Sequence, residues 1–109
     1  MTILFLVPVL ASCANDESGD TVAEKEHPGK RIYTRYCFSC HQGGVAGSPV
    51  LGDKEAWAPR LAKGRKALVK STLDGIPPGM PIMGLCLRCT EDEIRDAVDY
   101  MLEAVAEEK

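Results

Sequence analysis

The sequence has 109 residues, a formal net charge of −3 and 45% hydrophobic residues, which fits one small globular domain. The acidic balance argues against a nucleic-acid-binding protein, because such proteins present a basic stripe. Aromatic side chains are few, with one Trp, three Tyr and two Phe, so a core this small needs an added stabilising element.

The first residues are predicted to be an export signal. An apolar run over Ile3–Leu10 is followed by two small residues and then Cys13. This run is too short to span a bilayer as a mature helix and is typical of a signal peptide, here over residues 1–12. The ending Leu10-Ala11-Ser12-Cys13 resembles the lipobox of bacterial lipoproteins and implies acylation of Cys13, although no Lys or Arg precedes the run. A cleaved signal without lipid and an uncleaved anchor are the alternatives.

Residues 13–26 are predicted to be a flexible acidic tether. The segment is rich in Asp, Glu, Ser and Gly and has no apolar periodicity, and such a chain spans about 20 Å. An acylated Cys13 carrying more than one chain would give stable peripheral attachment to a membrane. Residues 27–109 are predicted to form the folded domain.

The folded part is predicted to be all-α, with helices joined by Gly/Pro-rich loops and no convincing strand. The first helix is expected to begin near Pro28, since proline is tolerated in a first turn. Ile32, Tyr33 and Tyr36 follow at helical spacing. His27 precedes this helix and is interpreted as a surface histidine rather than an iron ligand.

The first helix runs into Cys37-Phe38-Ser39-Cys40-His41, the signature for covalent haem attachment. Side chains at i and i+3 share one helix face, so the sulfurs of Cys37 and Cys40 can reach the two vinyl groups of one porphyrin. His41 is then placed to be the proximal iron ligand. The motif predicts one covalent haem c, with a zinc half-site or a thioredoxin-like redox pair as alternatives.

After the motif, a loop with several glycines and Pro49 precedes two further helices, predicted over residues 57–62 and 66–73. Residues 75–84 contain three prolines and are not expected to form regular helix. The last helix has a capping box in Thr90 and Glu93. Its expected buried stripe consists of Ile94, Ala97, Val98, Met101, Leu102 and Val105, and Tyr100 is expected to pack across a neighbouring helix.

A methionine is expected as the second iron ligand, because a thioether closes the iron site and raises the reduction potential. Met1 lies in the signal and Met101 in the buried stripe, which leaves Met80 and Met83 of the Pro/Gly loop. Met80 lies between Gly79 and Pro81, a stiff setting that favours it as the distal ligand, and Met83 is the fallback.

The pair Cys86 and Cys89 is predicted to form a disulfide, because an exported protein meets an oxidising compartment. The rival interpretation is a zinc site built from both cysteine pairs, Cys37 with Cys40 and Cys86 with Cys89. The long stretch between the two pairs exceeds the usual zinc-ribbon spacing, which favours the disulfide.

Several segments resemble the class I cytochromes c, in particular the small bacterial c5 type. They are Gly29-Lys30-Arg31-Ile32-Tyr33, Gly47-Ser48-Pro49, Gly52-Asp53, Trp57-Ala58-Pro59-Arg60, Gly75-Ile76, Met80-Pro81, Cys86-x-x-Cys89 and Ala97-Val98-Asp99-Tyr100-Met101. The resemblance implies the class I cytochrome c fold, with helices and Gly/Pro-rich loops wrapped around one covalent haem. The chain departs from the pattern at Met83-Gly84-Leu85 and Pro77-Pro78-Gly79.

The resemblance also implies roles for individual residues. Gly29 lets the first and last helices cross closely, and Met80 is favoured further over Met83. The carbonyl of Pro49 is expected to accept the second imidazole N–H of His41, a contact that fixes the ring. Trp57 and Arg60 are expected near the haem propionates.

The predicted function is one-electron transfer by a His/Met-ligated haem, without enzymatic activity, in the bacterial periplasm and with a lipid anchor on a membrane. The expected partners are redox proteins (an oxidase, reductase or dehydrogenase) and no nucleic acid, and the protein is expected to be a monomer, with a homodimer as the alternative. The chain has a basic excess between Lys54 and Lys70 and an acidic last helix. Such charge runs are usually just solvated faces, and the functional interpretation is that a basic face meets an acidic partner. The alternative function is a gas sensor or peroxidase-like enzyme with an open or displaceable sixth ligand.

Overall fold

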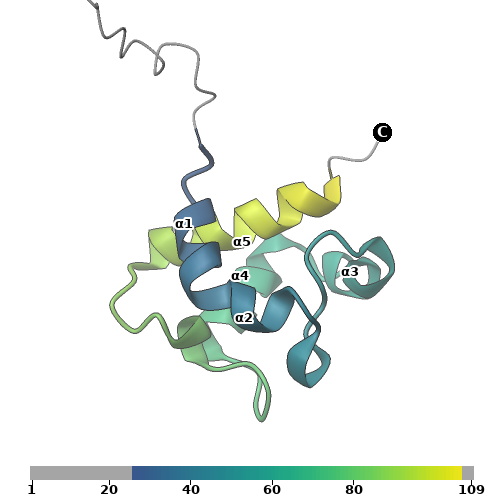
Figure 1. The fold of residues 1–109 in the computed structure, drawn as a ribbon, viewed down its shortest axis with the longest axis horizontal. Helices are drawn as coiled ribbons and strands as arrows, with labels where there is room; N and C mark the ends of the chain where they lie inside the picture. Colours follow the sequence, from purple (N-terminus) through teal and green to yellow (C-terminus); the bar gives the residue numbers. More distant parts are fainter. Residues whose placement is uncertain (1–25, 107–109) are drawn as a thin grey trace, which may run out of the picture.

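The structure, a computed structural model, describes residues 26–106, so the predicted signal peptide, Cys13 and nearly all of the tether lie outside the described residues. The helices are α1 (Lys30–Ile32), α2 (Phe38–His41), α3 (Lys54–Leu61), α4 (Arg65–Asp74) and α5 (Glu91–Ala106). The only paired extended backbone within residues 26–106 is an isolated antiparallel bridge between Ile76 and Met80. The predicted all-α class is therefore confirmed, and Figure 1 shows α1 lying across α5 with α3 toward one end.

The first predicted helix is present, but it is not a uniform α-helix. A five-residue π-turn over Tyr33–Cys37 separates α1 from α2, and the dihedral angles at its flanking residues stay helical. Such wide turns are rare and occur often at functional sites. This one delivers Cys37 to the start of the short helix that carries the rest of the haem-attachment motif.

Helices α1 and α5 cross at Gly29. A Cβ atom built on this glycine would lie 1.8 Å from the backbone oxygen of Asp96 and 2.7 Å from the backbone nitrogen of Ala97. Since these are backbone atoms of a helix, they cannot move aside as a side chain would. The close crossing implied by the resemblance is therefore present, and it depends on the missing side chain.

Helix α3 begins at Lys54, earlier than predicted. The side chain of Asp53 accepts hydrogen bonds from the backbone N–H groups of Glu55 (3.1 Å) and Ala56 (3.2 Å), which satisfies two free donors of the first turn. The prediction began the helix at Trp57 and overlooked this capping residue. The next helix was predicted more closely, since α4 extends beyond residues 66–73 by one residue at each end.

Helix α5 matches its prediction in both cap and buried stripe. Thr90 Oγ1 accepts from Glu93 N–H (3.2 Å), and Glu93 Oε2 accepts from Thr90 N–H (2.9 Å), which together form the capping box. The predicted stripe is buried except for Leu102, which is half-buried. Tyr100 packs across the crossing, with its ring centroid 5.2 Å from that of Tyr33.

The segment between α4 and α5 is mostly irregular, as its prolines predicted. A short 3₁₀ turn covers Ile82–Leu85, and Met83, Gly84 and Leu85 have φ angles of 54°, 58° and 70°. Left-handed backbone is unfavourable for residues with a side chain, so two of these three positions are strained. A disulfide between Cys86 and Cys89 follows immediately and joins this turn to the start of α5.

Candidate functional site

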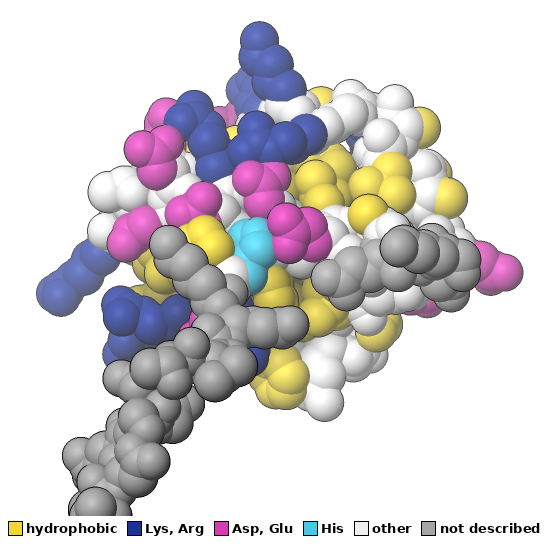
Figure 2. Space-filling model, turned by 90° about the horizontal axis from the view of Figure 1, so that it is seen from above, with side chains coloured by type: hydrophobic (Ala, Val, Ile, Leu, Met, Phe, Trp, Pro, Cys, Tyr) yellow, Lys and Arg dark blue, Asp and Glu magenta, His cyan; other side chains and the backbone are white. Residues whose placement is uncertain are grey.

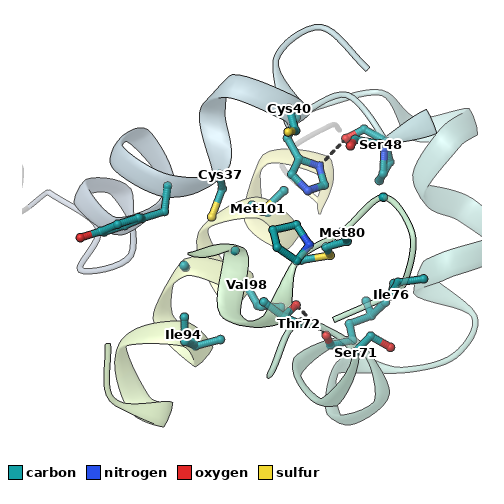
Figure 3. Close-up of a pocket in the computed structure, with 18 of the residues that line it drawn as sticks. Cys37, Cys40, Ser48, Ser71, Thr72, Ile76, Met80, Ile94, Val98 and Met101 are labelled. Carbon is teal, nitrogen blue, oxygen red and sulfur yellow. Dashed lines mark hydrogen bonds between the residues drawn. The ribbon is translucent and has the colours of Figure 1, made fainter. Parts of the chain in front are cut away.

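A deep apolar cleft lies between the haem-attachment motif and α5. It is lined by residues of the motif, α3, α4, the loop from Ile76 to Leu85 and α5. Figure 3 shows Cys37 and Cys40 on the helical side of this cleft, Met80 on the facing loop, and Val98 and Met101 of α5 along its wall. The buried stripe of α5 is thus also a wall of the site.

Cys37 and Cys40 are free thiols that line the cleft, and both are half-buried. Burial, together with the neighbouring Cys40, raises the pKa of Cys37 to about 11. Redox-active cysteines need the opposite, a lowered thiol pKa that favours the thiolate. A raised pKa at Cys37 therefore gives no support to the thioredoxin-like alternative.

His41 is buried, at 8% exposure, and its ring is held by the segment that follows the motif. Its Nδ1 lies 2.8 Å from the backbone oxygen of Pro49, so an N–H at Nδ1 donates to that carbonyl. The backbone oxygen of His41 accepts from Leu51 N–H at 2.8 Å. With Nδ1 occupied, Nε2 is the nitrogen available to bind a metal.

Trp57 and Arg60 both line the cleft. The indole ring of Trp57 stacks near the His41 ring, with centroids 6.2 Å apart and planes inclined by 28°. Its single N–H donates to the backbone oxygen of Val50 at 2.9 Å, so it is already used within the protein. Arg60 donates to the carbonyl of Ala56 in its own helix at 2.6 Å. The indole therefore supports the segment that orients His41, a role that sequence reasoning missed.

Of the two candidate methionines, Met80 lines the cleft and Met83 is not among the lining residues. The backbone of Met80 is fixed by two hydrogen bonds of 2.9 Å with Ile76, one in each direction. Gly75 makes this tight pairing possible, because its φ is +79° and a Cβ there would lie 2.9 Å from the backbone nitrogen of Ile82.

His27 lies away from the cleft and has a structural role. Its Nδ1 accepts from Gly29 N–H at 2.9 Å, and its Nε2 lies 3.2 Å from Glu103 Oε2. The ring also contacts Tyr100, with centroids 5.6 Å apart. The expectation of an ordinary surface histidine missed these contacts, which tie the segment before α1 to α5.

The structure gives no support to a zinc site made of the two cysteine pairs. Cys86 and Cys89 are joined to each other, and within residues 26–106 no three His, Cys, Asp or Glu side chains come together as a metal site. A thiolate cage would need both of these sulfurs.

The cleft fits a covalently bound haem. Its wall is overwhelmingly apolar, two free thiols project into it from one helical turn, and an imidazole and a thioether line it from different elements. These are the donor types that c-type haem uses for attachment and axial ligation. The residues that line the cleft therefore fit the covalent haem that the attachment motif predicts.

Acidic and basic side chains are interleaved on the α5 face of the molecule (Figure 2). Arg65 of α4 pairs with Asp99 of α5 through two contacts of 2.5 and 2.8 Å, and this guanidinium lowers the pKa of Asp99. Arg95 pairs with Asp92 at 2.9 Å within α5. The basic and acidic segments thus neutralise each other in part, which weakens the predicted charge asymmetry.

No helix among residues 26–106 combines the length and the apolar character that crossing a membrane requires.

Comparison with known proteins gives a consistent result. A family profile described as "Cytochrome C oxidase, cbb3-type, subunit III" matches residues 24–101. The chain is 36% identical over 101 residues to cytochrome c-555 of Chlorobaculum tepidum, covering 90% of this chain and 94% of that protein. It is also 36% identical over 72 residues to cytochrome c5 of Ectopseudomonas mendocina, covering 64% of this chain and 82% of that protein.

Among solved structures, one chain in an electron transfer complex of nitrite reductase with cytochrome c superposes with a TM-score of 0.69 at 41% identity. The match covers 75% of this chain and 99% of that one. Family profile, relatives and superposition all indicate the same family. The chain therefore belongs to the class I monohaem cytochromes c, small electron carriers with a single covalent haem c.

Proposed function

We propose that this chain carries one electron at a time between redox proteins, using a haem c that is bound by Cys37, Cys40, His41 and Met80. The single observation that carries this proposal is that all four side chains line one apolar cleft. A bound haem supplies an iron that alternates between the ferric and ferrous states. The polypeptide provides the attachment sites, the iron ligands and the apolar surroundings.

Attachment needs no oxidant. Cys37 and Cys40 would hold the haem through two thioethers, since the addition of each S–H across one vinyl C=C bond is redox-neutral. His41 would provide its Nε2 to the iron, while the Pro49 carbonyl holds Nδ1–H and keeps the ring oriented. Met80 would provide a thioether from the facing loop. The indole N–H of Trp57 donates a hydrogen bond to the Val50 carbonyl and so supports the segment that contains Pro49.

With His41 and Met80 both bound to the iron, no position would be open to a substrate, which would favour electron transfer over catalysis. The apolar wall offers few polar groups that could hold water, which limits the reorganisation that accompanies a change of charge. For these reasons the protein is proposed to be a carrier and not an enzyme.

The proposed partners are envelope redox proteins, and the proposed location is the bacterial periplasm. The solved complex in which a 41% identical cytochrome meets nitrite reductase supports partners of this class. The lipid anchor at Cys13 and the tether remain predictions from the sequence, as does the monomeric state.

The covalent haem can be tested by intact mass spectrometry of the matured protein. We expect the polypeptide mass plus one haem, with two hydrogens fewer for the Cys86–Cys89 disulfide. In Cys40→Ser the haem is expected to remain attached through one thioether, and in Cys37→Ser/Cys40→Ser acidified acetone should extract it. A colourless wild-type protein, or wild-type pigment released by acidified acetone, would refute the proposal.

The lipid anchor is tested separately by growing expressing cells with labelled palmitate. We expect the label on the wild-type chain, and loss of both the label and membrane association in Cys13→Ser. Label that survives this substitution contradicts the assignment to Cys13.

A further inference from the structure

Four large apolar side chains are exposed beside the cleft. Ile76, Ile82, Leu85 and Leu87 are 53%, 56%, 68% and 73% exposed, and we call them the apolar ridge. Ile76 and Leu85 also line the cleft, so they form part of its rim. Large apolar side chains grouped at one place on a surface indicate an interaction site.

The backbone conformation keeps the side chains of the ridge exposed to solvent. Leu85 has a φ of +70° and follows two other left-handed residues, and a side chain disfavours this conformation. The disulfide between Cys86 and Cys89 encloses Leu87, which is the most exposed member. Strained backbone of this kind persists where the surrounding structure enforces it, and it occurs preferentially at functional sites.

The charges around the ridge indicate its partner. Between Gly75 and Thr90 the sequence contains no Asp or Glu, and its one charged residue is Arg88. Arg88 is exposed, and the structure gives it no ion pair or hydrogen bond among residues 26–106. By contrast, Arg65 and Arg95 are paired with carboxylates. An apolar surface with an unpaired arginine complements an apolar surface with a carboxylate, and arginine is enriched at the centres of interfaces.

We infer that the apolar ridge and Arg88 form the docking surface for a redox partner protein that presents an apolar patch with a carboxylate at its rim. This inference rests on the proposed electron-carrier function. Docking there brings the partner against the rim of the cleft, so the electron crosses a short distance. An interface made of a few apolar side chains and one ion pair forms and separates quickly, as a carrier requires.

The inference can be tested with the haem-loaded full chain and nitrite reductase as the partner probe. Stopped-flow absorbance gives the second-order rate constant of electron transfer for the wild type, Leu85→Ser, Leu87→Ser and Arg88→Glu. Leu61→Ser is the matched control, because Leu61 is an exposed leucine (40%) on α3 that does not line the cleft. The midpoint potential of each variant separates docking from a changed driving force.

We expect the rate constant to fall by about tenfold in Leu87→Ser and in Leu85→Ser, as for an interface hot spot, and by less than about twofold in Leu61→Ser. Arg88→Glu should slow the reaction and reverse its dependence on ionic strength. The midpoint potential should be unchanged in Leu87→Ser and Arg88→Glu.

Rate constants at the wild-type value in Leu87→Ser and Arg88→Glu would overturn the docking surface while leaving the carrier function intact. A wild-type chain that transfers no electron to the reductase would refute the carrier function for this partner class, and the docking surface with it. A wild-type dimer that Leu87→Ser dissociates without changing electron transfer would show that the ridge binds a second copy, which also overturns the inference.

Discussion

Met80→Ala is expected to remove the weak red absorption band that is diagnostic of a methionine-ligated ferric haem and to produce a high-spin spectrum. The midpoint potential should fall by on the order of 0.2 V, a fraction of the roughly 0.8 V range that axial ligands span. The reason is that Met80 lines the cleft on a loop fixed by its two hydrogen bonds with Ile76, and the thioether favours ferrous iron. Absorption spectroscopy and potentiometric titration measure both effects.

Met83→Ala is the matched control and should keep the band, because Met83 does not line the cleft. Loss of the band in Met83→Ala but not in Met80→Ala would identify Met83 as the ligand and refute the assignment. The same spectra address the alternative function. A wild-type ferric protein that is already high-spin would support a gas-binding or peroxidase-like site with an open sixth position.

Gly29→Ala is expected to destabilise the protein by about 3 kcal/mol or more, at or above the upper end of the usual cost of overpacking a well-packed contact. The new methyl group would lie 1.8 Å from the backbone oxygen of Asp96, so α1 must move away from α5. That shift would also disturb the contact between the Tyr33 and Tyr100 rings. Guanidinium denaturation of the haem-loaded protein, followed by far-ultraviolet circular dichroism, measures the change.

Gly43→Ala is the matched control for this crossing. Gly43 lies in the loop after the motif, its backbone is not left-handed, and an added Cβ would meet nothing within 4 Å. We expect a change within about 0.5 kcal/mol, as for an ordinary surface substitution. Equal stabilities of Gly29→Ala and Gly43→Ala would mean that the helices do not cross as closely as the structure indicates.

Helix boundaries show where sequence reasoning was accurate and where it failed. The capping box of α5 and its apolar spacing are local signals, and both appear in the structure at the predicted positions. The start of α3 was missed because the cap at Asp53 lies outside the apolar pattern used to place the helix. The π-turn over Tyr33–Cys37 has no counterpart in the sequence pattern, since the apolar spacing reads as one continuous helix.

In the candidate site, too, some residues can be predicted from the sequence and others only from the structure. The attachment motif identifies Cys37, Cys40 and His41 by their spacing alone, because covalent haem attachment requires a fixed order of neighbouring residues. Met80 is favoured over Met83 first by its stiff setting between Gly79 and Pro81 and then by the resemblance to known cytochromes, and the cleft adds a geometric reason. The sequence marks Met83-Gly84-Leu85 only as a departure from the family pattern. The exposure of Leu85 depends on left-handed backbone angles that the sequence does not specify.

The sequence by itself therefore determined the cofactor chemistry, the all-α class and the amphipathic last helix, because each is encoded by residues close together along the chain. The tertiary structure decided which distant residues meet. It placed Pro49 against His41, brought Gly29 against Asp96, and tied His27 to Glu103. Such contacts depend on how helices cross and loops close, and those are collective properties of packing that no local pattern contains.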